Sequence, residues 1–275
     1  MAVNYAEKYS SQIDEKFALE SLTTGISDDS FDFVGVKTVN VYSVPTAKMN
    51  DYTRTGSSRY GTPSELDNTV QELTLSKDRS FTFTIDRGNF DETMMANSAG
   101  AALDRQLREV VVPEIDTYRL AELAEGASAT VSEVVTATNA YDVFLDGQAA
   151  LTNAKAPVSG RVAFVSPSFY KAIKQDQSFI RNGDASQKML LTGQVGEVDG
   201  TRLILTPDSY LPEDAAFILA APRSLVSPVK LADYKIHDNP PGINGWLVEG
   251  RVCYDAFVLT NKKPGVYVHL NKAAS

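Results

Sequence analysis

The chain has 275 residues, of which 43% are hydrophobic and 22% charged, and its formal net charge is −9. This composition is typical of a folded protein with a sizeable core and excludes an intrinsically disordered chain. The negative charge argues against a protein that wraps nucleic acid by neutralising phosphates. A single cysteine excludes an intramolecular disulfide, and with only two histidines the chain is poor in soft metal ligands.

No segment approaches the roughly 18 apolar residues that a membrane-spanning helix needs. The first residues, MAVNYAEKYSSQ, also lack the apolar core of a signal peptide. These absences lead us to expect a soluble protein made in the cytoplasm.

The N-terminal segment is expected to form a short amphipathic helix between Asn4 and Leu22, because its apolar side chains recur at the spacing of one helix face. Up to Asp32 the segment contains two lysines and seven acidic residues. It is either a helix packed on its own domain or an acidic arm that docks on a neighbouring molecule.

Three strands are predicted in the next part of the chain. Residues 31–42 alternate apolar and polar side chains, and residues 70–75 and 81–85 are further strands, joined by a turn at residues 76–79. Residues 46–68 between them are polar and punctuated by glycine and proline. A loop of this length is often functional, and here it is either a disordered surface loop or an extended hairpin arm.

The longest helical pattern runs from Asn89 to Glu125, with a capping-box variant at its start and Gly126 just past its end. Such a helix would be roughly 50 Å long, which is too long for an ordinary compact domain. Pro113 falls inside the pattern, so we expect a kink or an interruption one turn before it. The pattern therefore predicts the spine of an elongated subunit.

The middle of the chain mixes helices and strands. A small-residue linker is expected at 127–133, followed by helix 138–155, strand 161–166 and a helix that begins at Pro167. A hairpin turns at Asp199-Gly200, and Ala215–Ala221 is expected to be a buried strand.

The C-terminal part is expected to be rich in β-strands. Strands are predicted at 230–237, 245–259 and 266–270, with a turn at 239–242 and a type II turn at Lys263-Pro264-Gly265.

Familiar catalytic patterns are absent from the sequence. It has no Gly-x-Ser-x-Gly nucleophile elbow, phosphate-binding loop or dinucleotide fingerprint, and His237 and His269 each lack a second ligand at metal spacing. Cys253 is expected to be a buried structural thiol. Glu114 and Asp116 are explained more simply by ion pairs than by acid–base chemistry. We therefore predict no catalytic, cofactor-binding or metal-binding residues and no enzymatic activity.

Two stretches carry a family resemblance. Leu75–Leu120 resembles the strand and spine helix of tailed-bacteriophage major capsid proteins of the Hong Kong 97 type, and Pro240–His269 resembles their C-terminal strands. The resemblance implies an α+β fold with a long spine helix, a β-rich peripheral domain, an α/β axial domain, an extended E-loop and an N-terminal arm.

The resemblance also implies domain boundaries. The N-terminal arm would comprise residues 1–32, and the first part of the peripheral domain residues 33–127, with the E-loop at 44–68 and the spine helix at 90–125. The axial domain would comprise residues 128–235. Residues 236–275 would supply the C-terminal strands of the peripheral domain.

By the same resemblance, the chain is a major capsid subunit that self-assembles into pentamers and hexamers of an icosahedral shell around double-stranded DNA. Its partners would be copies of itself, with scaffolding, portal and decoration proteins as further candidates. Neither sequence-specific nucleic-acid binding nor a membrane is implied. The candidate inter-subunit contacts lie in the E-loop: Lys48, Arg54, Arg59, Tyr60 and Glu65.

Two departures and two alternatives remain open. Some family members begin with a long charged scaffolding segment, whereas here about 30 residues precede the first expected strand; if the chain is full length, scaffolding would be a separate protein or dispensable. Lys48 is the only E-loop lysine that could join a covalent crosslink. An encapsulin-like nanocompartment shell protein shares the fold and is the leading alternative. A β-rich hydrolase or binding protein is a third possibility.

Overall fold

The computed structural model describes residues 21–28, 31, 38–63, 65–88, 99–178 and 196–273. Two compact units divide the chain: residues 32–75 form one, and the remaining residues form the other. The smaller unit contains β1 (Thr38–Ser43) and β2 (Thr69–Thr74), an antiparallel pair in which Ser43 lies opposite Thr69.

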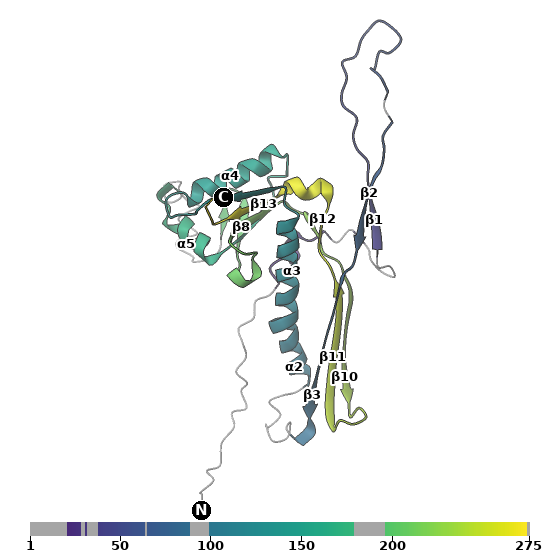
Figure 1. The fold of residues 1–275 in the computed structure, drawn as a ribbon, viewed down its shortest axis with the longest axis vertical. Helices are drawn as coiled ribbons and strands as arrows, with labels where there is room; N and C mark the ends of the chain where they lie inside the picture. Colours follow the sequence, from purple (N-terminus) through teal and green to yellow (C-terminus); the bar gives the residue numbers. More distant parts are fainter. Residues whose placement is uncertain are drawn as a thin grey trace, which may run out of the picture. The chain divides into compact units, whose positions relative to one another are not determined.

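The larger unit contains the spine helix, which is continuous over the described residues from Ala99 to Glu125 (Figure 1). It consists of α2 (Ala99–Gln106), a π-helical turn η2 (Leu107–Val111) and α3 (Val112–Glu125). Pro113 stands in the first turn of α3, and the residues before it form a π-helical turn with helical backbone angles. The sequence predicted a kink or an interruption here, whereas the helix changes its hydrogen bonding and is not interrupted. The expected start at Asn89 lies outside the described residues.

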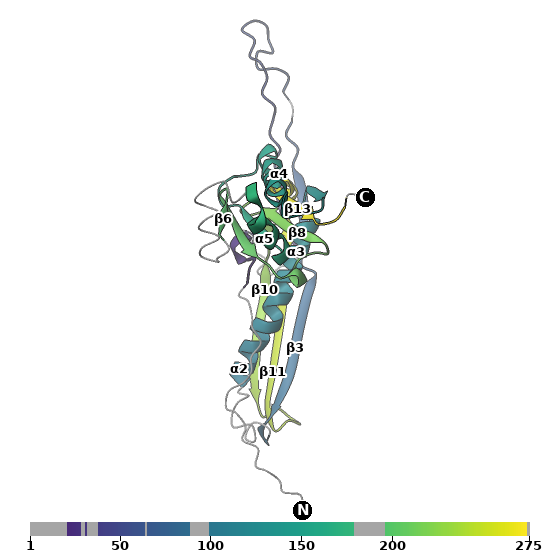
Figure 2. The same cartoon turned by 90° about the vertical axis from the view of Figure 1, so that its left-hand side faces the viewer.

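A three-stranded antiparallel sheet lies alongside the spine helix, in the order β10-β11-β3 (Figure 2). Its strands are β3 (Lys77–Asp86), β10 (Val229–Asp238) and β11 (Gly245–Tyr254). The expected turn at 76–79 is wrong, because Lys77, Asp78 and Arg79 already pair with β11. Pairing with a neighbouring strand determines the conformation of these three residues more strongly than their turn-like composition does.

A six-stranded mixed sheet forms the other layer, in the order β4-β13-β8-β5-β7-β6. Its strands are β4 (Ala129–Ser132), β5 (Val162–Val165), β6 (Glu197–Val198), β7 (Thr201–Leu205), β8 (Ala215–Ala220) and β13 (Val266–Leu270). All residues of β5 and β8 are buried, which explains their uninterrupted apolar sequences. The expected linker at 127–133 is wrong, since β4 lies within it and pairs in parallel with β13.

Both faces of this sheet are covered. Helices α4 (Ala140–Asn153) and α5 (Pro167–Gln175) pack on one face, with Phe144, Phe169 and Phe217 in that core. On the other face, Leu120 and Leu123 of α3 pack with residues of β5, β8 and β13. The short 3-10 helix η1 (Thr24–Ile26) contributes Ile26 to the same cluster.

The remaining elements are short. They are η3 (Asp208–Tyr210), β9 (Leu225–Val226), β12 (Phe257–Val258), which pairs with β9, and η4 (Thr260–Gly265). The expected single strand 245–259 is therefore wrong, because it is interrupted at Asp255 and Ala256. The expected type II turn at 263–265 is also wrong, because these residues continue a 3-10 helix.

The remaining sequence predictions have mixed outcomes. The strand predicted at 31–42 is described only from Thr38, and residues 32–37 lie outside the described part, as do 1–20 and 179–195. Asp199 and Gly200 have positive φ angles of 49° and 74°, so the predicted hairpin turn is confirmed. Cys253 is half-buried rather than buried.

No helix among the described residues is long and apolar enough to cross a bilayer.

Candidate functional site

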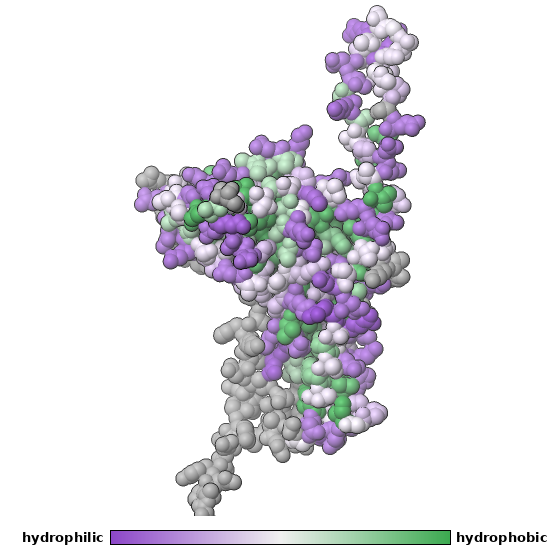
Figure 3. Space-filling view, viewed as in Figure 1, coloured by the Kyte–Doolittle hydropathy of each residue, from purple (hydrophilic) through white to green (hydrophobic). Residues whose placement is uncertain are grey.

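The connection between β1 and β2 carries all five residues that the sequence singles out as contact candidates. Lys48, Arg54, Arg59, Tyr60 and Glu65 are all exposed. The space-filling view shows mostly hydrophilic and intermediate colours over this loop (Figure 3). Lys48, Arg54 and Glu65 form no ion pair with any other residue that the structure describes.

Local hydrogen bonds shape the tip of the loop. The Thr53 N–H donates to the Arg59 carbonyl at 3.0 Å, and the Arg59 Nε donates to the Gly56 carbonyl at 3.1 Å. Gly61 has a φ of 86°, and a Cβ at this position would lie 2.6 Å from the Asn50 side chain. The tip is therefore a defined turn in which Arg59 is held by its own backbone neighbours.

Two further side chains of the same loop, Met49 and Tyr52, were missed by sequence reasoning, which named Tyr60 but not these two. Met49 is 98% exposed and Tyr60 84% exposed, and the Tyr60 ring meets the Tyr52 ring edge-on with 5.1 Å between centroids. Two tyrosines and a methionine in an otherwise polar segment were the signal that could have identified them. Exposed side chains of this kind are typical of protein–protein contacts.

The first half of the spine helix is only partly covered. None of the residues of α2 and η2 is buried, and Val110 is 45% exposed. A cavity of about 450 Å³ lies between this half of the helix and β3, with Phe83, Ile85 and Arg105 among its lining residues. The unit thus leaves part of its longest element accessible.

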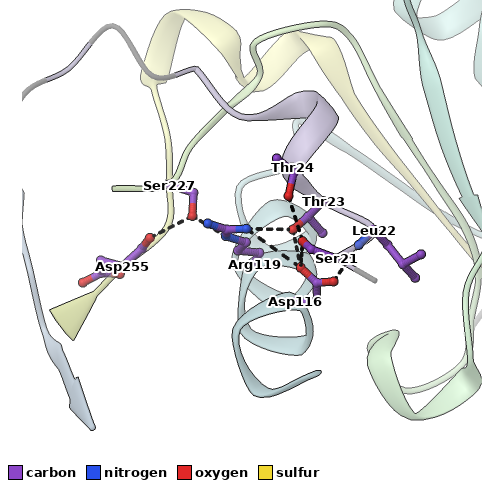
Figure 4. Close-up of polar contacts among 8 residues, drawn as sticks. All are labelled: Ser21, Leu22, Thr23, Thr24, Asp116, Arg119, Ser227 and Asp255. Carbon is purple, nitrogen blue, oxygen red and sulfur yellow. Dashed lines mark hydrogen bonds and ion pairs between the residues drawn. The ribbon is translucent and has the colours of Figure 1, made fainter. Parts of the chain in front are cut away.

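The second half of the spine helix anchors the N-terminal segment through a polar network (Figure 4). Asp116, which is 1% exposed, accepts hydrogen bonds from Ser21 Oγ at 2.9 Å, the Leu22 N–H at 2.7 Å and Thr23 Oγ1 at 2.5 Å. Arg119 lies beside Asp116 with 3.9 Å between Nη1 and Oδ1. The buried carboxylate is thus satisfied by donors from a distant part of the chain.

Arg119 extends this network towards the sheets. Its Nε donates to Ser227 Oγ, and Ser227 Oγ in turn donates to the Asp255 carbonyl at 3.2 Å. The Asp255 carboxylate accepts from the Ser76 N–H and from the Tyr118 hydroxyl, both at 2.7 Å. Burial, with the hydrogen bond to Asp255, raises the pKa of Tyr118 above its usual range.

Glu114 belongs to a second ion-pair cluster on the same helix. Arg79 Nε donates to Glu114 Oε1 at 2.6 Å, and the Tyr254 hydroxyl donates to the same oxygen at 3.1 Å. The hydrogen bond from Arg79 lowers the pKa of Glu114, whereas burial, with the Glu114 charge, raises the pKa of Tyr254 to about 12. An ion pair thus accounts for Glu114, as predicted, whereas Asp116 is held mainly by hydrogen bonds from the N-terminal segment, with Arg119 beside it.

The two histidines lie in different environments. His237 is exposed, with Nε2 at 3.2 Å from Glu249 Oε2, whereas His269 is buried in β13. Among the described residues, no group of three or more histidine, cysteine or acidic side chains is placed to hold a metal ion.

Comparison with solved structures shows which known proteins share this fold. The chain aligns with solved structures from Mycobacterium phage Che8 (17% identity, 98% of both chains, TM-score 0.77) and from the capsid of cyanophage P-SCSP1u (12% identity, 98% of this chain and 94% of the other, TM-score 0.75). The virus-like particle from Pyrococcus furiosus aligns less well, with 12% identity, 85% and 86% coverage and a TM-score of 0.53. A search of curated proteins finds no match.

The decisive comparison is with a family model. The model described as phage capsid protein matches residues 72–268, which contain the spine helix and, apart from the last two residues of β13, both larger sheets. The long helix and mixed sheets agree with the Hong Kong 97-like fold that the sequence resemblance implied. The chain is a structural protein, a major capsid subunit, and it belongs to the phage capsid protein family.

Proposed function

We propose that copies of this chain form pentamers and hexamers of an icosahedral shell around double-stranded DNA, and that the subunit is made in the cytoplasm of a bacterial host. The observation that supports this proposal is the loop at 44–68, which exposes charged and apolar side chains, and whose Lys48, Arg54 and Glu65 form no ion pair with any residue that the structure describes. A heterologous contact of this kind generates closed rings when the rotation between subunits closes.

The loop would act as an E-loop that lies across a neighbouring subunit. Lys48, Arg54 and Arg59 would meet acidic groups of the neighbour, Glu65 would meet a basic group, and Tyr60 would supply an apolar anchor. Burying an aromatic side chain at the centre of an interface typically contributes more than rim charges do. The partly covered half of the spine helix is a second surface that a neighbour would shield.

We propose the domain division that the sequence resemblance implies, with two adjustments that follow from strand pairing. The arm is placed at 1–32, the peripheral domain at 33–127 and 236–275, and the axial domain at 128–235. Strand β13 pairs with β4 and β8, so we assign Val266–Leu270 to the axial domain instead. Strand β10 pairs with β11, so we assign residues 229–235 to the peripheral domain.

The negative charge of the chain suits a container for DNA. A net charge of −9 disfavours tight adhesion of packed phosphates to the wall. The subunit would therefore need no sequence-specific nucleic-acid contacts and no catalytic step or cofactor. Scaffolding, portal and decoration proteins are proposed as further partners.

The test replaces residues 44–68 with Asn-Gly. Because Ser43 and Thr69 are register partners, a two-residue type I′ turn can close β1 and β2 directly. We expect a soluble subunit whose circular dichroism and thermal unfolding match those of the full chain. Electron microscopy should show open or irregular assemblies in place of closed shells.

A matched control keeps the loop but changes an exposed residue of another unit, Lys171→Ala. This variant should form normal particles. Normal closed shells from the shortened chain would refute the role of the loop in assembly. Purified shells that contain protein cargo and no DNA would favour a nanocompartment over a phage capsid.

A further inference from the structure

Strand β10 is an edge strand of the three-stranded sheet, with one register irregularity between Val229 and Leu231 at its start. It is the outermost strand, and among the described strands it pairs only with β11 (Figure 2). It is ten residues long, and Val229 and Ile236 are 46% and 45% exposed. A long edge strand offers unpaired N–H and C=O groups, and proteins often protect such an edge against pairing with charged side chains, especially lysine.

The charges of β10 are instead arranged symmetrically about its centre. The strand reads VKLADYKIHD, with Lys230 four residues before Tyr234 and Asp238 four residues after it. Asp233 and Lys235 flank Tyr234 directly. In an antiparallel pairing of β10 with a copy of itself centred on Tyr234, Lys235 lies opposite Asp233, and Lys230 comes near Asp238 at the ends of the strand.

We propose that β10 pairs antiparallel with β10 of a second copy across a two-fold axis at Tyr234. The two three-stranded sheets then form one six-stranded sheet. The contact is isologous, because the same strand is used on both sides. It adds a strand-to-strand interface to the loop-mediated contacts of the proposed shell, and it depends only on self-association.

The charges on the outer face of the sheet fit this pairing. Within one chain, Asp233 lies opposite Arg251, and Lys235 lies opposite Glu249. One row across the joined sheets would therefore read Arg251, Asp233, the partner's Lys235 and the partner's Glu249. The sign alternates along the whole row, and opposite charges directly across neighbouring strands are stabilising.

Asp233 and Lys235 can keep their present ion pair with each other when the strands of two copies pair. Lys235 Nζ lies 2.9 Å from Asp233 Oδ2, and the Lys235 and Asp233 side chains remain 60% and 47% exposed. Pairing would place a second carboxylate beside each lysine and a second ammonium beside each aspartate. No charge is buried without a partner, which is the usual cost of closing a charged edge.

The opposite face of the strand is aromatic. Tyr234 is half-buried and stacks on Phe81 of β3 with 6.2 Å between ring centroids. The two-fold axis would bring the Tyr234 side chains of both copies next to each other on the face that carries the spine helix. Ile236, now partly exposed, would be flanked by the partner strand. The interface thus has one face centred on the two Tyr234 rings, with Lys230 and Asp238 towards its ends, and one face on which Asp233 and Lys235 alternate in charge.

Disulfide trapping tests the register. Cys253 is the only cysteine, so Cys253→Ser gives a clean background. In that background, full-length Asp233→Cys and Lys235→Cys proteins are assembled separately and as an equal mixture, then oxidised. Because residue 233 lies opposite residue 235 of the partner, the mixture should give covalent dimers on a non-reducing gel. Each variant alone should give at least about fivefold less covalent dimer. In that case the two cysteines occupy the same position in both copies, so they are diagonal rather than direct neighbours and lie too far apart for a disulfide.

Charge reversal provides a second test that does not depend on trapping. Asp233→Lys alone and Lys235→Asp alone each place like charges opposite each other, and each should weaken self-association about tenfold. An equal mixture of the two variants restores opposite charges at every position and should recover wild-type association. Association is measured by analytical ultracentrifugation and particle yield.

The results of these experiments distinguish a failure of the β10 pairing from a failure of the proposed shell function. Closed shells without a mixture-specific crosslink, or a mixture that associates no better than the single variants, would overturn the β10 pairing and leave the shell function intact. Crosslinked dimers from a chain that forms no shells would support the pairing and count against the shell.

Discussion

At the scale of single residues, the least expected feature is the buried guanidinium of Arg161. The side chain is 2% exposed and donates five hydrogen bonds near the C-terminal end of α4. The acceptors are the carbonyls of Pro157, Gln148 and Ala156, the Gln148 side chain and Thr152 Oγ1, at 2.6 to 3.2 Å. Burial lowers the pKa of Arg161, and the carbonyl dipoles at the helix end stabilise the charge.

Arg161→Lys should destabilise the subunit strongly. A lysine keeps the charge but has no planar fork to satisfy five acceptors, so several buried carbonyls lose their partners. We expect the free energy of unfolding to fall by about 3 kcal/mol in denaturant titrations. The exposed Arg202→Lys is the matched control and should change stability little. Equal stability of the two variants would contradict this account.

A second residue-scale prediction concerns His269. Its ring stacks on Phe217 with 5.2 Å between centroids, and Nε2 lies 3.0 Å from the Glu133 carbonyl. Burial lowers the pKa of His269, although the hydrogen bond to Glu133 opposes this shift. Because the unfolded chain binds the proton more readily, stability should be fully present above the unfolded pKa of about 6.5 and decline below it.

The measurement is the free energy of unfolding between pH 7.5 and pH 5. His269 can contribute a slope of at most about 1.4 kcal/mol per pH unit in this window. His269→Gln should reduce the slope, while the exposed His237→Gln serves as control. An unchanged slope in His269→Gln would show that this histidine does not titrate on unfolding.

At the scale of elements, the spine helix shows how a proline is accommodated. Proline has no N–H and crowds the carbonyl four residues earlier, which here is that of Glu109. The π-helical turn at Leu107–Val111 lies at this position, and the Val112 N–H donates to the Leu107 carbonyl, five residues back. The extra residue in the turn widens the helix where Pro113 disturbs it.

Pro113→Ala restores the missing donor and permits a regular α-helical turn. We expect this change to alter the direction of the first half of the spine, and therefore particle shape or yield, more than subunit stability. Electron microscopy and thermal unfolding are the measurements, and Pro157→Ala in an exposed loop is the control. An unchanged particle population would count against a role of Pro113 in setting curvature.

The elements also show where sequence reasoning succeeds and where it stops. The spine helix, α4, α5 and most strands follow from apolar periodicity and from capping residues such as Ser166, whose Oγ accepts from the Phe169 N–H. Strand pairing does not follow from these patterns. Nothing in Lys77–Arg79 reveals that β11 supplies their partners, and the short β4 is a strand only because β13 lies beside it.

The candidate contact residues illustrate the same limit. A polar loop of this length could be recognised from composition, and its five candidates are exposed in the structure. The buried polar network could not, because Asp116 and its donors Ser21, Leu22 and Thr23 are more than ninety residues apart. Local patterns report local structure, whereas such contacts depend on the complete chain path.

At the scale of the whole molecule, the larger unit combines two kinds of sheet with different protection. The six-stranded sheet is covered by helices on one face and by the spine on the other, and it contains most of the buried apolar residues. The three-stranded sheet is packed on one face, and its outer face carries ion pairs such as Asp78–Arg251. The six-stranded sheet therefore contributes most of the stability of the unit. The three-stranded sheet offers the surface that is available to other copies.

The junction at Asp255 links these two parts and has a mechanical consequence. Its carboxylate binds Ser76, immediately before β3, and Tyr118 of the spine, while its N–H donates to Pro228, immediately before β10, at 3.2 Å. Asp255 itself follows the last residue of β11. The spine and one end of each strand in the sheet are therefore fastened at one residue. Tension on this sheet would be shared among these bonds, so they would have to break together rather than one after another.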